Sequence, residues 1–150
     1  MSSADLYQQM ILEHNKKPRN FGELEGATHK AEGFNPLCGD HLWVYLKVGE
    51  DGLITEAAFT GSGCAISKAS ASLMTVALKG KTVAEAETIF GEFHELLTGA
   101  FKPAEHPEHH LGKLVIFSGI WQYPSRVKCA ALAWHAMHGA LGREASISTE

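Results

Sequence analysis

The sequence has little basic charge and no long apolar run. Lys and Arg total 13 against 17 Asp and Glu, which gives a formal net charge of -4. A surface with this balance does not favour nucleic acid as a partner. No stretch approaches the roughly 20 apolar residues of a membrane span, and the N-terminus lacks the features of a secretory signal. We therefore expect a cytoplasmic protein that binds neither nucleic acid nor membranes.

Cysteine is also scarce, because the chain contains only Cys38, Cys64 and Cys129. Three thiols cannot all pair within one chain, and the cytoplasm keeps thiols reduced, so disulfide staples are not expected. The closely spaced CxxC pairs of zinc ribbons are absent from the sequence. The three cysteines are therefore buried hydrophobes, reactive thiols or metal ligands.

The hydrophobic pattern predicts one domain over residues 1–150, with helices and strands in a segregated order. Alternating apolar residues followed by the turn sequence GEDG predict a β-hairpin, and a capping box from Thr82 to Glu85 begins one of the helices. The hairpin strands cover 42–48 and 53–60, and helices are expected over 4–15, 65–80, 82–99 and 124–141. Residues 102–110 are predicted to form a polar loop, whereas 113–120 fit either a short strand or a buried turn.

The predicted elements place the cysteines at related positions. Cys38 precedes the first hairpin strand and Cys64 follows the second, so both should lie at the same end of the sheet. Cys129 falls early in the last helix. With Asp40, these thiols give three sulfurs and one oxygen, a donor set that suits tetrahedral zinc or an iron–sulfur cluster. Spacing alone leaves two interpretations open, a metal site and scattered buried thiols.

Four motifs in order make the sequence similar to the U-type iron–sulfur cluster assembly proteins, the IscU/NifU-like family. They are ILEHNKKPRNFG, NPLCGD, GSGCAISKASAS and RVKCAALAW. The resemblance implies an α+β fold in which a small antiparallel sheet packs against helices. It also implies a metal site formed by Cys38, Asp40, Cys64 and Cys129, and sulfur delivery from a cysteine desulfurase as a persulfide.

Two departures make the chain resemble the SufU-type branch of that family. Lys128 stands where scaffold-type members carry a histidine, and a longer segment, roughly within 80–121, separates the second and third cysteines. This resemblance implies a zinc-dependent sulfurtransferase that passes sulfur to a downstream acceptor protein, with Cys38 as the persulfide acceptor. Arg126 is a further candidate, because its charge could stabilise thiolates or attract an acidic partner. The alternatives are a [2Fe–2S] scaffold and a structural zinc domain.

The nine histidines and three tryptophans are not expected to add to this site. His106, His109 and His110 lie in the polar loop, where solvation is the simplest interpretation. His135 and His138 share a helical face but lie beyond Cys129, so packing is favoured for them. Packing is also expected for Trp43, Trp121 and Trp134.

Overall fold

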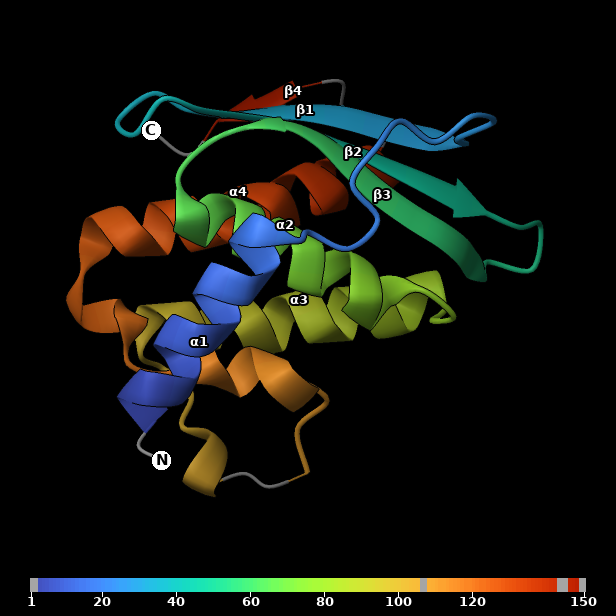
Figure 1. The fold of residues 1–150 in the computed structure, drawn as a ribbon. Helices are drawn as coiled ribbons and strands as arrows, with labels where there is room; N and C mark the ends of the chain where they lie inside the picture. The colour runs from blue at the N-terminus through green and yellow to red at the C-terminus, as the bar shows by residue number, and fades with distance from the viewer. Residues whose placement is uncertain (1–2, 106–107, 143–145, 149–150) are drawn as a thin grey trace.

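The computed structural model describes residues 3–105, 108–142 and 146–148 and has an α+β fold (Figure 1). Its helices are α1 (Ser3–Lys16), α2 (Ala65–Leu78), α3 (Val83–Thr98) and α4 (Pro124–Leu141). Its strands are β1 (His29–Asn35), β2 (Asp40–Val48), β3 (Ile54–Ser62) and β4 (Ser146–Ser148). Three short 3-10 helices lie between α3 and α4: η1 (Pro103–Glu105), η2 (Gly112–Phe117) and η3 (Ile120–Gln122). The four predicted α-helices and the predicted hairpin are confirmed.

The sheet has the order β3-β2-β1-β4, with β1, β2 and β3 antiparallel and β4 parallel to β1. The sequence did not predict β1, whose buried positions are Ala31, Gly33 and Asn35 rather than large apolar residues. The reason is close packing of a helix on this strand. A Cβ atom on Gly33 would lie 3.1 Å from Leu132 Cδ1 of α4. A strand shaped by this contact lacks the apolar alternation that identifies strands in a sequence.

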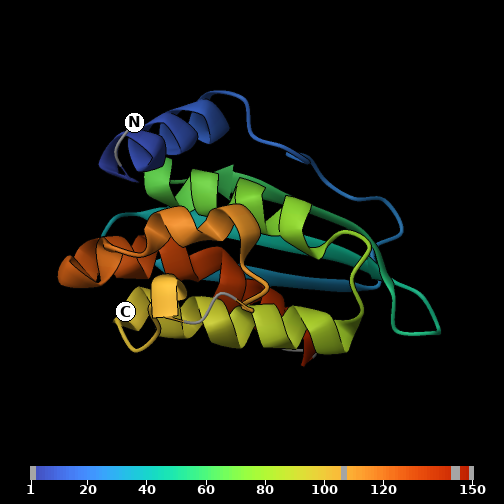
Figure 2. The ribbon, with the colours of Figure 1, turned by 90° about the horizontal axis from the view of Figure 1, so that it is seen from below.

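The α-helices cover one face of the sheet, as Figures 1 and 2 show. α2 and α4 lie against the strands, α1 packs on α2, and α3 packs on α4. Small side chains let α2 and α4 approach closely, and Ser70 Oγ donates a 2.6 Å hydrogen bond to the carbonyl of Ala130. This contact fixes the first turns of α4, where Cys129 lies, relative to α2.

Among the described residues of 80–121 lie α3, η1, η2 and the start of η3. The stretch 113–120, for which a strand or a buried turn was expected, is mostly 3-10 helix and not a strand. Phe117 of η2 is fully buried, and its ring packs edge-on against Phe93 and Tyr7. The aromatic contacts thus join this segment to α3 and α1. Its identity as a family-branch insertion stays a prediction.

The expectations for histidine and tryptophan have mixed outcomes. His110 pairs with Glu92, and His135 and His138 lie against Phe90 of α3, whereas His106 falls outside the described residues. Of the tryptophans, Trp134 is buried, Trp43 is half-buried and Trp121 is exposed. Within the described ranges, no helix combines the length and apolar character needed to cross a bilayer.

Candidate metal centre

The β1–β2 hairpin holds Asp40 in a fixed, buried position. Asp40 pairs with Asn35 across the two strands, and residues 36–39 form the connecting loop that carries Cys38. The loop is closed by a 3.2 Å hydrogen bond from the Cys38 N–H to the Asn35 carbonyl, and Gly39 has the positive φ of 71° that glycine adopts readily. Asp40 is only 2% exposed, so its carboxylate needs hydrogen-bond donors.

Both oxygens of the Asp40 carboxylate accept hydrogen bonds. Oδ1 accepts the backbone N–H of Cys64 at 2.8 Å, and Oδ2 accepts the side-chain amide of Asn35 at 3.0 Å. The first bond ties the start of β2 to the residue before α2, and Cys38 and Cys64 do lie at the same end of the sheet. Space here is tight, because a Cβ on Gly63 would lie 2.7 Å from Asp40 Oδ1.

Cys64 is the N-cap of α2, where a thiolate is favoured. Its sulfur accepts the backbone N–H of Ser67 at 3.4 Å, and its side chain is half-buried. A hydrogen bond with Cys129 is the largest influence and, with the Ser67 N–H, lowers the pKa of Cys64 to about 7, while burial opposes the shift. The lowered pKa favours the thiolate form of Cys64.

Cys129 has the opposite behaviour and is buried in α4. Hydrogen bonding to Cys64 is the largest cause that raises the pKa of Cys129 far above its ordinary value, followed by burial and the bond to Cys38. Its sulfur lies 3.3 Å from Cys38 Sγ and 3.6 Å from Asn35 Nδ2. Cys129 thus keeps its proton unless a cation replaces it.

The donor atoms fit a bound metal ion. Ligand atoms of Cys38, Asp40 and Cys129 all lie within 4.8 Å of one another. Cys64 is not in that mutually close group, but its sulfur lies 4.0 Å from Asp40 Oδ2. Thiolate sulfur with one carboxylate oxygen suits zinc or iron. A cation would also offset the negative charge of thiolates that cannot all form together beside the buried Asp40 carboxylate.

A family comparison agrees with this constellation. Residues 6–130 match the model of the NifU-like N terminal domain. The chain belongs to the NifU-like N-terminal domain family. This confirms the IscU/NifU-like resemblance.

Relatives of the NifU-like family carry two kinds of name. The chain is 36% identical over 140 residues to the zinc-dependent sulfurtransferase SufU of Bacillus subtilis, covering 93% of this chain and 91% of that protein. It is 38% identical over 141 residues to the iron–sulfur cluster assembly scaffold protein IscU of Streptococcus pyogenes serotype M1, covering 94% and 86%.

A solved relative has the same fold. The Fervidobacterium islandicum AW-1 protein, described as a candidate iron–sulfur cluster assembly scaffold for the SUF system, superposes with a TM-score of 0.82 at 32% identity. The alignment covers 93% of this chain and 99% of that one. Membership of the NifU-like family and a general link to iron–sulfur cluster assembly follow, while the names do not separate sulfur transfer from scaffolding.

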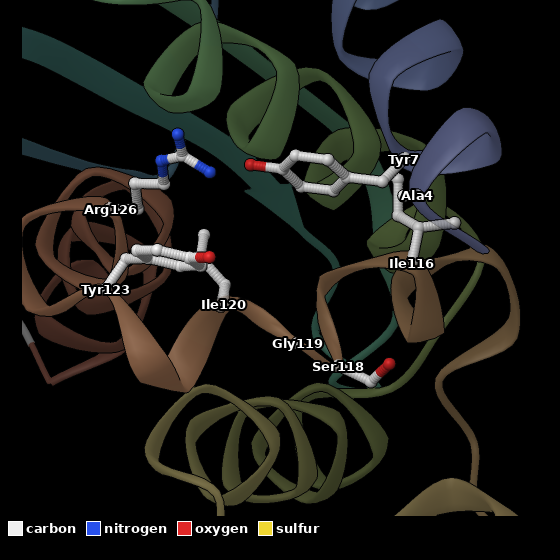
Figure 3. A pocket seen from close by; sticks show the side chains of 8 residues that line it. All are labelled: Ala4, Tyr7, Ile116, Ser118, Gly119, Ile120, Tyr123 and Arg126. Atoms are coloured by element: carbon white, nitrogen blue, oxygen red, sulfur yellow. The ribbon is translucent and has the colours of Figure 1, made fainter.

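Arg126 lies on the first turn of α4, three residues before Cys129. Its guanidinium packs over the ring of Tyr123, 4.6 Å from the centroid, and faces the hydroxyl of Tyr7 across a pocket of about 300 Å³ (Figure 3). Burial raises the pKa of Tyr7, and the charge of Arg126 opposes that shift, while Cys64 and Cys129 add to it. The Tyr7 hydroxyl is therefore close enough to Arg126, Cys64 and Cys129 for their charges to influence its pKa.

Sequence reasoning missed Asn35 and the aromatic contacts around the hairpin. Asn35 opens the NPLCGD motif, so its position was a usable signal. On the strands, His41 stacks between Phe34 and Trp43, with centroids 4.2 and 4.1 Å apart, and bonds to Glu32. These contacts brace β2 immediately beside Asp40.

The variant Gly63→Ala tests whether the position of Asp40 matters. The added methyl would displace the buried carboxylate, and we expect affinity for zinc to fall roughly tenfold to hundredfold, as when the support of a metal ligand is lost. Competition with a chromophoric chelator measures this. Gly91→Ala is the matched control, since nothing lies within 4 Å of a Cβ there. Unchanged affinity in Gly63→Ala would argue that Asp40 is not a ligand.

Proposed function

We propose that this protein is a zinc-dependent sulfur acceptor that takes persulfide sulfur from a SufS-type cysteine desulfurase for iron–sulfur cluster biogenesis. The observation that carries the proposal is the convergence of three thiols and a carboxylate in which only one thiol is exposed. Cys38 is exposed, Cys64 is half-buried and Cys129 is buried. A donor set of this kind can bind a metal and still offer one sulfur to a partner protein.

The residues that would hold the zinc ion are Cys38, Asp40, Cys64 and Cys129. Bound zinc would keep their thiols deprotonated and shield them from oxidation. Asp40 is the hard oxygen in an otherwise soft set and so the weaker ligand. The cytoplasm suits this chemistry, because free thiols persist there.

The transfer itself is a thiol exchange at Cys38. The Cys38 thiolate attacks the outer sulfur of a persulfide, R–S–SH, on the desulfurase. A new S–S bond forms while the bond to the desulfurase sulfur breaks, so R–S⁻ leaves with the electron pair and Cys38 carries –S–SH. The reaction needs no added oxidant or reductant. The exposed loop at 36–39 lets Cys38 reach the partner, and a downstream acceptor protein would receive the sulfur by the same exchange.

Two features support sulfur transfer over the alternative, a scaffold on which a [2Fe–2S] cluster is assembled. Lys128 directly precedes Cys129, where an imidazole would offer a further metal ligand and an ammonium group does not. The second feature is the long segment between Cys64 and Cys129, roughly within residues 80–121, which the resemblance assigns to the SufU-type branch. A purely structural zinc site is disfavoured because the sulfur of such a site is usually enclosed, whereas Cys38 is exposed.

Metal and acid-labile sulfide analysis of anaerobically purified protein separates the two functions. We expect about one zinc per chain, no cluster absorbance after challenge with iron, cysteine and a desulfurase, and faster desulfurase turnover when the protein is present. If iron and sulfide instead replace zinc and the product rebuilds an apo-ferredoxin, the protein is a scaffold and the sulfur-acceptor assignment is wrong.

The variant Cys38→Ser tests the acceptor assignment. Serine cannot form a persulfide, so we expect sulfur acceptance from the desulfurase to be abolished, as measured by mass spectrometry of the intact protein without reductant. Val76→Ser is the control, because it also places serine at an exposed position of the folded protein but lies far along α2. A Cys38→Ser protein that still gains one sulfur would assign acceptance to Cys64 or Cys129.

We further propose that Arg126 attracts the anionic persulfide or an acidic surface of the desulfurase. Its side chain is exposed and lies on the first turn of the helix that carries Cys129, and its positive charge acts on Tyr7, whose hydroxyl is also influenced by Cys64 and Cys129. Such a charge acts mainly on the rate of encounter.

Arg126→Ala should slow sulfur acceptance up to about tenfold at low salt, with a smaller effect at high salt because ions screen the attraction. Single-turnover kinetics at several salt concentrations measure this. Arg126→Lys should restore most of the rate, and Lys113→Ala, which removes an exposed cation from η2, should change little. A loss that does not depend on salt would instead assign Arg126 to packing against Tyr123.

A further inference from the structure

Asn35 contacts three of the four proposed ligands, Cys38, Asp40 and Cys129. Its backbone carbonyl accepts the N–H of Cys38, and its side-chain amide donates to Asp40 Oδ2 and lies 3.6 Å from Cys129 Sγ. Its side chain is fully buried at the end of β1. Water cannot replace these contacts without entering the packed space between sheet and helices.

The orientation of the Asn35 amide is set by the charge around it. Asp40 is an anionic acceptor, and Cys129 would become one when a bound cation replaces its proton, so the NH₂ group faces both and the carbonyl oxygen faces away. In that orientation Asn35 Oδ1 is buried without a hydrogen-bond partner among the described residues. A buried acceptor left without a partner is costly, and such exceptions in folded proteins call for a reason. Here the reason is that the donor side of the amide is needed at the thiol site.

We propose that Asn35 is the positioning residue of the metal centre, whose amide shares its protons between the Asp40 carboxylate and the Cys129 sulfur. The inference rests on the proposed metal site. Each hydrogen bond withdraws electron density from an anionic ligand and offsets part of the negative charge that burial would otherwise disfavour. Asn35 thereby sets the metal affinity of the site and the electron donation of one thiolate, without itself binding the metal.

The variant Asn35→Ala tests this role because it removes the amide and keeps the backbone bond to Cys38. We expect zinc affinity to fall roughly tenfold to hundredfold, since two buried anions lose their common donor. In the Co²⁺-substituted protein, the sulfur-to-cobalt charge-transfer band should move to longer wavelength because the Cys129 thiolate becomes more electron-rich. Chelator competition and absorption spectroscopy measure these effects, and neither depends on sulfur-transfer activity.

Ser72→Ala is the matched control for loss of a buried polar group. Ser72 is also fully buried and bonds to His14 and to the backbone N–H of Arg19, away from the thiols. This variant should lose stability without a change in the charge-transfer band. If Asn35→Ala keeps both the metal affinity and the band of the unaltered protein, the inference is overturned. If the unaltered protein binds neither zinc nor cobalt, the result contradicts the proposed zinc-dependent function itself and not only the role of Asn35.

A second measurement needs no variant and so holds even if Asn35→Ala does not fold. On addition of zinc or cadmium to the unaltered protein, the side-chain amide resonances of Asn35 should shift in the ¹H–¹⁵N spectrum. Those of Asn20, whose amide donates to Thr75 Oγ1 at 3.0 Å, serve as the internal reference. Asn35 resonances that move no more than those of Asn20 would show that its amide does not act on the ligands.

Discussion

The carboxylate of Asp40 joins the sheet to the helices at the end of the molecule where the three thiols meet. Its Oδ1 accepts a hydrogen bond from the backbone N–H of Cys64, directly before α2, and its Oδ2 accepts one from the side-chain amide of Asn35 at the end of β1. The pairing of β2 with β3 already places the Cys38 loop and the α2 N-cap at the same end of the sheet, and the Asp40 hydrogen bonds add a direct link between them. Because Asp40 is buried, its hydrogen bonds are not exchanged for water, and the positions of Cys38 and Cys64 depend on them.

Because Asp40, Cys64 and Cys129 lie close together, their negative charges would repel one another if all three were ionised. The pKa of Cys64 is lowered to about 7, whereas the pKa of the neighbouring Cys129 is raised. When the pair holds one proton, that proton therefore lies on Cys129 and Cys64 is the thiolate. Adding the Asp40 carboxylate leaves a buried site that can carry more negative charge only if a cation enters. The arrangement therefore favours a metal on electrostatic grounds that are independent of the family resemblance.

Local patterns in the sequence correctly predicted the elements that are determined by residues close together in the chain. The capping box at Thr82 is formed as expected, and the alternation over 42–48 identified β2. The pattern failed for β1, because contact with α4 requires Gly33 where an apolar side chain would identify a strand. Asn35 was missed for the same reason, since its partnership with Asp40 exists only once β1 pairs with β2.

The position of Arg126 illustrates a second limit. Its place one turn before Cys129 follows from helical spacing, but its neighbour Tyr7 comes from α1, more than a hundred residues earlier in the chain. Docking of α1 on α2 brings that phenol to the pocket, and nothing in the spacing of the cysteines indicates it. The candidate ligands were proposed from the sequence, whereas the approach of Tyr7 depends on the packing of elements far apart in the chain.

Access and acidity favour different cysteines as the proposed sulfur acceptor. Cys64 has the lowered pKa, but its sulfur is half-buried and already accepts the Ser67 N–H, which reduces its nucleophilicity. Cys129 is buried and holds its proton. Cys38 lies in the exposed loop, next to a glycine with open space around it. Since the proposed persulfide transfer needs direct contact between two sulfurs on different proteins, access favours Cys38 over the less accessible Cys64 and Cys129.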